Sequence, residues 1–425
     1  MNTQEQMAHI GQAAKQASRQ LARLSARKKN SILEAMAEAL EAHRTPIQTA
    51  NAKDLQAGRE AGLSSAMLDR LELNDARIDS MIKGLHDVAV LNDPVGDEIA
   101  AWNRPNGLHI SKVRAPIGVI GIIFESRPNV TCDAAALCFK TSNAVILRGG
   151  KEAIHSNLAI ANALQEGGEA KGLPPNAIQL VPITDREAVR ELCRMTDYLD
   201  LIIPRGGEGL INAVAEMALV PVIKHYKGIC HTYIDATAKL DMAWAIAENA
   251  KCQRPGVCNA METLLVHQAI ADDFLPTMGE RLQAAGVTIR GDETTRTHIP
   301  SAQAATEEDW FTEYLDLTLA IRVVNDTEAA IDHINHYGSG HSDAIVTQDT
   351  ESEKQFLAEV DSSSVYVNAS TRFTDGAEFG MGAEIGISTD KLHARGPMGL
   401  EELTTYKFII EGTGQIRPSL KHKKS

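Results

Sequence analysis

Several features that mark other classes of protein are missing from this sequence. It has no run of about 18 apolar residues that would span a membrane, and no apolar signal core near its start. Its six cysteines form no CxxC pair, and its 14 histidines form no HExxH motif. We therefore expect neither a disulfide framework nor a metal site. A diffuse net charge of −14 argues against nucleic-acid binding, because phosphate binding needs a basic face. A small-molecule partner and a reducing cytoplasm are the expected setting.

The residues that are present alternate between helix and strand signals. Residues 1–95 are rich in Ala, Leu, Glu and Arg with apolar positions every three or four residues, which predicts helices. From residue 116 the pattern changes, and 117–123 and 144–147 are buried-type strands separated by an Ala-rich helix. A second series begins near residue 228. A chain of 425 residues with this pattern predicts an α/β fold of two doubly wound domains.

One short segment interrupts this alternation. Asn106-Gly107 lies between two strand-like runs, 98–102 and 108–113, which is a strong hairpin signal. Residues 406–410 form a plausible closing strand near the end of the chain. We expect the hairpin to be an arm used for homo-oligomerisation.

Cys258 is the cysteine whose surroundings favour chemistry. It follows Pro255-Gly256, a turn that ends a predicted helix, and it precedes a predicted strand. Loops on a rigid scaffold are common places for catalytic groups, and the nearby Arg254 would favour the thiolate. The other cysteines lie in or at the ends of predicted helices or next to a predicted strand, where inert roles are more common.

The segment Gln253–Glu262 resembles the cysteine loop of the aldehyde dehydrogenase superfamily, most closely that of the γ-glutamyl phosphate reductases. The similarity extends over nearly the whole chain, with matching blocks at 71–96, 122–130, 140–153, 222–228 and 379–389. The resemblance implies an aldehyde-dehydrogenase-like fold. It divides the chain into a nucleotide-binding domain (1–97 and 114–228), an oligomerisation arm with a closing strand (98–113 and 404–425) and a catalytic cysteine domain (229–403).

The resemblance also implies a reaction. L-glutamyl 5-phosphate and NADPH would give L-glutamate 5-semialdehyde, phosphate and NADP in the second step of proline biosynthesis. The Cys258 thiolate would attack the acyl phosphate and form a thioester, which hydride then reduces. The amide of Asn129 and the backbone N–H near Cys258 would stabilise the oxyanion. Aldehyde-oxidising members carry a base glutamate in Glu-Leu-Gly-Gly, where this chain has His225-Tyr226-Lys227-Gly228.

The cofactor residues follow predicted strands. No GxGxxG motif opens a helix, which the family does not need. Arg148, Gly149 and Lys151 form a loop whose cations suit a 2′-phosphate, and hence NADPH. Backbone N–H groups of the run Pro204, Gly206 and Gly207 would approach the pyrophosphate. Glu313 matches the superfamily glutamate that holds the nicotinamide ribose.

The acidic groups of the substrate need cationic partners. The candidates are Arg127, Lys224 and Arg372, with His225 as a further substrate or acid–base residue. For each cation, a structural salt bridge is an equally good interpretation.

Three alternatives stay open on the sequence. The first is a thioester-forming aldehyde dehydrogenase for another small aldehyde, with water or coenzyme A as acceptor. The second is a cysteine hydrolase that pairs Cys258 with His225, His231 or His267. The third is a scaffold that kept the fold without the activity. A complex with glutamate 5-kinase would deliver the unstable acyl phosphate, although no motif indicates one.

Overall fold

A computed structural model describes residues 2–224 and 227–417. The chain divides into two compact units. Unit 1 comprises residues 1–205, 217–222 and 399–425, and unit 2 comprises residues 206–216 and 223–398. The chain thus crosses between the units at 205/206, 216/217, 222/223 and 398/399, and residues 206–216, which we expected in the nucleotide-binding domain, cluster with unit 2. The hairpin arm clusters with unit 1.

Unit 1 opens with the predicted helices. They are α1 (Thr3–Leu21), α2 (Ala26–Ala42), α3 (Arg44–Glu60), α4 (Ser65–Leu71) and α5 (Asp75–Val90). Side-chain caps fix their starts: Asn2 and Glu5 form a capping box on α1, and Asn74 accepts from the N–H of Arg77 on α5. The α2 face that contains Ile32, Met36 and Leu40 is fully buried, as the three-and-four spacing predicts.

The central sheet of unit 1 has four parallel strands in the order β5-β4-β3-β6. The strands are β3 (Val119–Phe124), β4 (Ala144–Arg148), β5 (Ile178–Leu180) and β6 (Leu201–Arg205), and the helices are α6 (Asn129–Lys140), α7 (Ile154–Ala170) and α8 (Arg186–Arg194). Residues of β3 and β4 are buried without exception, which explains their continuous apolar sequence. The strand order reverses between β3 and β6, so the loops after β3, β4 and β6 follow neighbouring carboxyl ends, where doubly wound sheets bind ligands.

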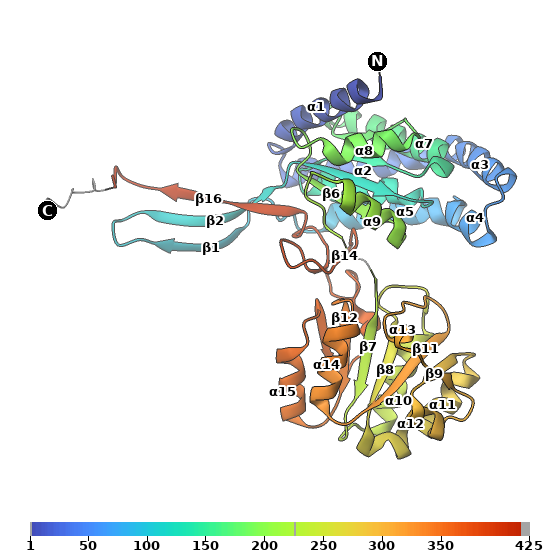
Figure 1. Ribbon diagram of the computed structural model, residues 1–425. Coiled ribbons are helices and arrows are strands. Elements are labelled where there is room, and N and C mark those ends of the chain that lie inside the picture. Colours follow the sequence, from blue (N-terminus) through green and yellow to red (C-terminus); the bar gives the residue numbers. More distant parts are fainter. Residues whose placement is uncertain (1, 225–226, 418–425) are drawn as a thin grey trace. The chain divides into compact units, whose positions relative to one another are not determined.

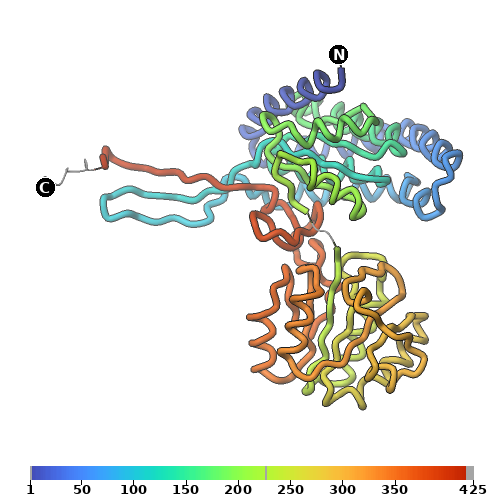
Figure 2. The backbone as a smooth tube through the Cα atoms, viewed as in Figure 1, coloured from blue at the N-terminus to red at the C-terminus, as the bar shows by residue number. Residues whose placement is uncertain are grey.

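The predicted hairpin is confirmed. Strands β1 (Glu98–Asn103) and β2 (His109–Pro116) pair antiparallel, and the turn closes where Arg104 N–H donates to the Leu108 carbonyl at 2.8 Å. Strand β16 (Thr404–Glu411) pairs antiparallel with β2 over eight residues. Figure 1 shows β1, β2 and β16 as one three-stranded ribbon, and Figure 2 shows the red C-terminal segment returning beside the teal hairpin.

Unit 2 contains a seven-stranded parallel sheet in the order β10-β9-β11-β8-β7-β12-β13. Its strands are β7 (Cys230–Ile234), β8 (Met261–His267), β9 (Thr288–Gly291), β10 (Gln303–Ala304), β11 (Thr318–Val324), β12 (Ser342–Val346) and β13 (Ser364–Val367). Its helices are α9 (Glu208–Met217), α10 (Leu240–Cys252), α11 (Ala271–Ala284), α12 (Glu293–His298), α13 (Glu307–Trp310), α14 (Thr327–Tyr337) and α15 (Thr350–Glu359). A small β14 (Ile387–Ser388) pairs antiparallel with β15 (Gly396–Pro397), and short 3₁₀ turns span Gln268–Ile270 and Thr371–Phe373 in this unit and Lys151–Ala153 in unit 1.

Helices cover both faces of this sheet. Leu264 and Val266 of β8 pack into one apolar cluster with Phe274 of α11, while Leu265 packs into a second cluster with Phe356 of α15. This alternation follows from the two-residue period of a strand. The sheet is therefore doubly wound, as predicted.

Two further observations bear on the expected setting. No helix within residues 2–224 and 227–417 is long and apolar enough to cross a membrane. In the same residues, no group of three His, Cys, Asp or Glu side chains is arranged to hold a metal ion.

Candidate active site

Cys258 lies in a loop that joins α10 to β8. Cys132, Cys138, Cys193 and Cys230 are buried, whereas Cys258 and Cys252 are half-exposed. Burial raises the pKa of Cys252, and the carboxylate of Glu248 raises it further. Cys252 is therefore a poor nucleophile. Exposure excludes the four buried cysteines, and the raised pKa of Cys252 together with the loop position of Cys258 favours Cys258.

The backbone of the Cys258 loop packs against the start of β7. A Cβ atom on Gly228 would lie 2.0 Å from the Cys258 carbonyl oxygen, so only glycine permits this approach. The thiol of Cys230 donates to the same oxygen at 3.2 Å. Because β7 and β8 are parallel neighbours, their amino ends meet at one edge of the sheet. The contacts of Gly228 and Cys230 at this edge therefore fix the backbone at Cys258.

Glu313 reaches the same place from the segment before β11. Its Oε1 accepts the N–H of Gly228 at 2.9 Å. Burial raises the pKa of Glu313, and the Gly228 N–H and the Lys227 ammonium oppose the rise. The predicted cofactor residue is thus bonded to the same glycine that packs on Cys258. Its proposed bond to a ribose stays a prediction.

Asn259 fixes the other side of the loop. Its Nδ2 donates to the Thr374 carbonyl at 2.8 Å, and the Thr371 hydroxyl donates to the Asn259 carbonyl at 2.8 Å. Arg372 lies between these two threonines, and its Nε donates to Gln253 Oε1 at 2.9 Å. Burial, followed by repulsion from Arg254, lowers the pKa of Arg372. Two guanidinium groups therefore lie close to each other at the cysteine loop.

The other predicted cation of this unit has an acidic partner. The backbone N–H of Lys224 donates to Asp390 Oδ2 at 3.0 Å, and its ammonium lies 3.4 Å from Asp390 Oδ1. Lys224 therefore matches its salt-bridge interpretation at least in part. His225 lies outside the described residues.

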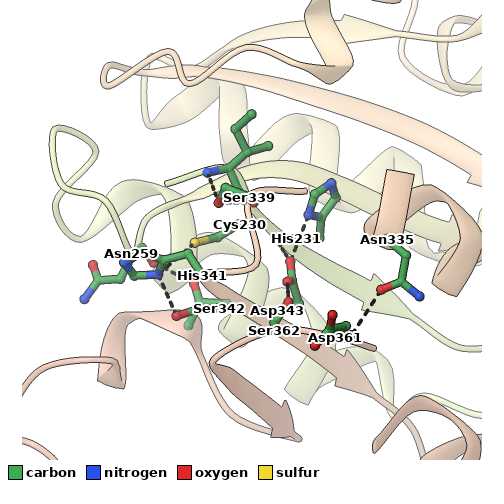
Figure 3. Close-up of polar contacts among 12 residues, drawn as sticks. Cys230, His231, Asn259, Asn335, Ser339, His341, Ser342, Asp343, Asp361 and Ser362 are labelled. Carbon is green, nitrogen blue, oxygen red and sulfur yellow. Dashed lines mark hydrogen bonds and ion pairs between the residues drawn. The ribbon is translucent and has the colours of Figure 1, made fainter. Parts of the chain in front are cut away.

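The two remaining histidines proposed as hydrolase partners have other surroundings. His231 Nδ1 lies 2.8 Å from Asp343 Oδ1, and both side chains are fully buried (Figure 3). His267 ends β8, seven residues of strand beyond the end that Cys258 precedes, and its ring accepts the N–H of Ala269. At about 3.3 Å per residue, that strand separates it from Cys258 by roughly 20 Å. Neither contact supports a cysteine–histidine hydrolase.

In unit 1, Asn129 is the first residue of α6. Its Nδ2 donates to Asp133 Oδ2 at 2.9 Å, one helical turn away. Burial raises the pKa of Asp133 to about 6, and the Asn129 amide and Arg205 oppose the rise. The side-chain amide proposed for the oxyanion is therefore oriented by a carboxylate. Arg127 is exposed in the preceding turn, and Ser126 there has φ of 35° and donates to Glu152 through its N–H and hydroxyl.

The loop after β4 contains the predicted cofactor cations. The Arg148 guanidinium is buried, and it donates to the Gly149 carbonyl at 2.7 Å and the Thr184 carbonyl at 2.8 Å. A Cβ on Gly149 would lie 2.1 Å from Asn157 Nδ2. Lys151, by contrast, is exposed. The structure gives Arg148 and Gly149 packing roles and presents Lys151 to solvent, while a cofactor contact of all three stays a prediction.

The loop after β6 begins at Gly206, just beyond a strand that contains a buried proline. Pro204 lies inside β6, and Gly206 and Gly207 separate this strand from α9. A Cβ on Gly207 would meet nothing within 4 Å. This open space leaves the backbone accessible, as a pyrophosphate contact requires.

Comparison with known proteins gives the chain its family. A model of the aldehyde dehydrogenase family matches residues 1–318. A protein of Moorella thermoacetica named gamma-glutamyl phosphate reductase is 60% identical, over 98% of this chain and 100% of that protein. The chain belongs to the aldehyde dehydrogenase family, and within it to the gamma-glutamyl phosphate reductases.

Solved structures agree with this assignment. The gamma-glutamyl phosphate reductase of Thermotoga maritima superposes with a TM-score of 0.96 at 48% identity and covers 97% of this chain and 100% of its own. The enzyme of that name from Saccharomyces cerevisiae is 32% identical over 98% of this chain and 99% of its own, with a TM-score of 0.54. The predicted fold class is confirmed. Members of the aldehyde dehydrogenase family use a nicotinamide cofactor.

Some groups near the candidate residues were missed in the sequence. Asp133 is four residues from Asn129 on a predicted helix, so the i, i+4 rule would have found it. Cys230 was noted without a role, and only the sheet register brings it to Cys258. A buried ion pair, Lys251 with Glu262, joins a helix end to a strand start, and no spacing rule predicts such a pair.

Proposed function

We propose that this chain reduces L-glutamyl 5-phosphate to L-glutamate 5-semialdehyde and phosphate through a thioester on Cys258, with NADPH as the reductant. The relatives of that name, which match over nearly the full length, support the substrate. The observation that carries the proposal is a partly exposed Cys258 whose loop is held by contacts of Gly228, Cys230 and Asn259.

The chain's own residues provide the covalent step. The Cys258 thiolate attacks the acyl carbon, the C–O bond to phosphate breaks, and phosphate leaves as a thioester forms. Arg254 and Arg372 place positive charge at the cysteine loop, which favours the thiolate and an anionic substrate group. Asn129 and the backbone N–H near Cys258 donate to the oxyanion. Arg127, Lys224 and His225 stay candidates for the rest of the substrate.

The residues present fit a nicotinamide dinucleotide. Three loops follow the carboxyl ends of β3, β4 and β6, and Gly207 leaves open space beside its Cα. The exposed Lys151 suits a 2′-phosphate and therefore NADPH, whereas Arg148 shapes its loop. Pro204, Gly206 and Gly207 would approach the pyrophosphate, and Glu313 would hold the nicotinamide ribose. The bound cofactor would supply the hydride that reduces the thioester to the aldehyde.

The lack of a base glutamate favours reduction over hydrolysis. Positions 225–228 read His-Tyr-Lys-Gly instead of Glu-Leu-Gly-Gly, so His225 stands where the base glutamate would be. A thioester that water does not attack can wait for hydride. The alternative, an aldehyde dehydrogenase with coenzyme A as acceptor, differs in the nucleophile that accepts the acyl group.

The test is the reverse reaction. The wild-type chain should reduce NADP with glutamate semialdehyde only when phosphate is present, and Cys258→Ala should lower the rate by about 10³-fold or more. Cys252→Ala, the other half-exposed cysteine, is the matched control and should keep full activity. Activity with coenzyme A in place of phosphate would favour the alternative, and an active Cys258→Ala variant would rule out the thioester.

The arm supports a homo-oligomer. Its apolar side chains include Trp102, Phe408 and Ile410, which are 40%, 52% and 59% exposed, and the rings of Trp102 and Phe408 contact edge to face. Such an exposed patch on a sheet is typical of a surface that a second copy covers. Phe408→Asp with Ile410→Asp should reduce the mass measured by light scattering, while Tyr406→Phe should leave it unchanged.

Two further parts of the proposal concern the setting. We place the enzyme in the cytoplasm, where its free cysteines stay reduced. A complex with glutamate 5-kinase would shorten the path of the unstable acyl phosphate. Co-sedimentation of the two purified enzymes is the direct test of that complex.

A further inference from the structure

The loop that presents Cys258 is closed at its base by an ion pair. Lys251 lies in the last turn of α10 and Glu262 is the second residue of β8, so the pair spans the start and the end of the loop. Lys251 Nζ lies 2.6 Å from Glu262 Oε2, and both side chains are 0% exposed. Burying two charges costs free energy that an apolar pair would not cost, so added stability alone is a weak explanation for the pair.

The second oxygen of Glu262 holds a different segment. Glu262 Oε1 accepts the backbone N–H of Leu315 at 3.2 Å. Leu315 has φ of 56°, the left-handed conformation that is costly for a branched residue, yet its side chain is 47% exposed. Packing of the side chain therefore does not explain the strained backbone. The bond to Glu262 does, because it fixes the direction of that N–H.

The strained segment leads directly to Glu313. Glu313 lies two residues before Leu315, and its carboxylate accepts the N–H of Gly228, whose backbone packs on Cys258. On the other side, the Leu315 carbonyl lies 3.4 Å from where a Cβ of Gly256 would be, in the Pro-Gly turn of the cysteine loop. Glu262 is thus bonded both to the base of the loop, through Lys251, and to the segment that carries Glu313, through the Leu315 N–H.

The surroundings of Glu262 explain why it needs Lys251. Burial raises the pKa of Glu262 to about 7, the Lys251 ammonium opposes the rise, and the charge of Glu313 adds to it. Tyr314, over whose ring Lys251 lies, and the thiol of Cys230 on β7 are the other ionisable groups that sense this carboxylate. Without the ammonium of Lys251, the carboxylate would take up a proton in this buried site.

We propose that Glu262, held in place by Lys251, is a positioning residue that fixes the position of Cys258 relative to Glu313. The tether from Glu262 to the Leu315 N–H keeps the cofactor-binding glutamate aligned with the loop that carries the nucleophile. This inference rests on the proposed roles of Cys258 and Glu313 as nucleophile and cofactor ligand. It assigns a role in the reaction to two residues that touch neither substrate nor cofactor.

Two double variants separate the tether from the charge pair. Lys251→Met with Glu262→Gln removes both charges but keeps an oxygen that accepts the Leu315 N–H. Lys251→Met with Glu262→Leu removes the charges and the acceptor, with a side chain of similar volume. The two proteins differ only at the tether, so a comparison of them cancels the effect of losing the ion pair.

The readouts are steady-state kinetics, the alkylation of Cys258 by iodoacetamide followed by mass spectrometry, and thermal unfolding. We expect the Gln variant to stay within about threefold of wild type in kcat. The Leu variant should lose roughly tenfold or more in kcat, raise the KM for NADP severalfold, and change the alkylation rate of Cys258 well below its unfolding temperature. A role in stability alone would lower the unfolding temperature of both variants and leave kcat, KM and alkylation equal between them.

Equal kinetics in the two variants would overturn the proposal, whether both are active or both are impaired. If the Leu variant fails to fold, Glu262→Asp replaces it, because a carboxylate shorter by one methylene cannot reach Lys251 and Leu315 together. Glu262→Asp should show the same fall in kcat and rise in KM, and wild-type kinetics would again overturn the proposal. Alkylation is measured without substrate, so it reports on the loop even if the proposed reaction is wrong, which an active Cys258→Ala variant would reveal separately.

Discussion

The two units each contain a lysine–carboxylate pair whose side chains are less than 10% exposed, and the pairs differ in their balance of charge. In unit 1, Lys29 of α2 is paired with Asp93, which follows α5, and the ammonium also donates to the Lys140 carbonyl and the Ser142 hydroxyl at 2.8 and 2.9 Å. A second buried lysine, Lys140, donates to Asn30 and to the Ala89 carbonyl. Burial lowers the pKa of both lysines, and Asp93 opposes this.

In unit 2, one buried lysine pairs with one buried glutamate, so their charges balance. Lys251 and Glu262 join the two ends of a single loop, whereas Lys29 and Asp93 join helices that are far apart in sequence. Lys140 is the last residue of α6, eleven residues after Asn129, so about 16 Å of helix separates Lys140 from Asn129. A buried lysine–carboxylate pair thus joins parts of the helical layer in unit 1, and in our proposal it positions the candidate site in unit 2.

The largest effect should come from the carboxylate of unit 1. Asp93→Asn leaves Lys29 and Lys140 without their shared carboxylate, so we expect the free energy of unfolding to fall by about 3–5 kcal/mol. Urea unfolding followed by circular dichroism measures this loss. Cys258 alkylation in the folded variant should match wild type, because the cluster belongs to unit 1 and the cysteine loop to unit 2.

A matched exposed aspartate supplies the control. Asp87 forms an exposed i, i+4 pair with Lys83, and Asp87→Asn should change the free energy of unfolding by no more than about 0.5 kcal/mol. A loss below about 1 kcal/mol in Asp93→Asn would show that the two lysines are satisfied by backbone acceptors alone. The contrast between the two units would then disappear.

The comparison also shows what a sequence can and cannot reveal. Residues 117–123 and 144–147 are recognisable as buried strands because short, continuous apolar runs next to turn residues are typical of a parallel sheet, and both strands formed as predicted. Strand β12 has no such signal because it starts with Ser342 and Asp343, two buried polar residues whose partners Thr374 and His231 are distant in sequence. A polar residue satisfied by a distant partner gives no local signal.

The candidate site shows the same limit. Cys258 and Arg254 were found from a Pro-Gly turn and the family motif, since both are local in sequence. Arg148 was expected to be a cofactor cation from its place after a strand, but its carbonyl partners depend on the loop at Thr184. Charge type and position along the chain predict which residues reach a site. They do not predict whether each residue binds a ligand or a carbonyl of its own chain.

His333 shows another way to bury an ionisable group, which is to keep it neutral. It is 4% exposed, packs against Trp310 and Tyr337, and accepts from Arg322 through Nδ1 at 3.0 Å. Burial, with repulsion from His231 and Arg322, lowers the pKa of His333 to about 2. In the unfolded chain His333 takes up a proton near pH 6.5, whereas in the folded chain it stays neutral at that pH. Stability from this residue is therefore present above pH 6.5 and is lost as the pH falls.

Replacement by a ring that cannot titrate should remove this acid sensitivity. Between pH 6.5 and pH 5, His333→Phe should lose about 2 kcal/mol less stability than wild type, since each pH unit in that window corresponds to about 1.4 kcal/mol. His336→Phe, an exposed neighbour on α14, should follow the wild-type curve. Parallel curves for wild type and His333→Phe would show that His333 is protonated in the folded chain.

The smallest effect concerns the carboxylate that orients Asn129. The pKa of Asp133 is raised to about 6, so the folded chain releases its proton well above the usual range of an aspartate. As the pH falls through 6, Asp133 takes up a proton and its bond from the Asn129 amide weakens, so kcat should drop by roughly threefold across this step.

Asp133→Asn should keep kcat within a few fold of wild type and show no step near pH 6. Asn129→Ala should lose the step as well, because the residue that Asp133 orients is gone. A step of wild-type size in Asp133→Asn would assign it to another group, and Asn129 would then lose the support that its contact with Asp133 gives to an oxyanion role.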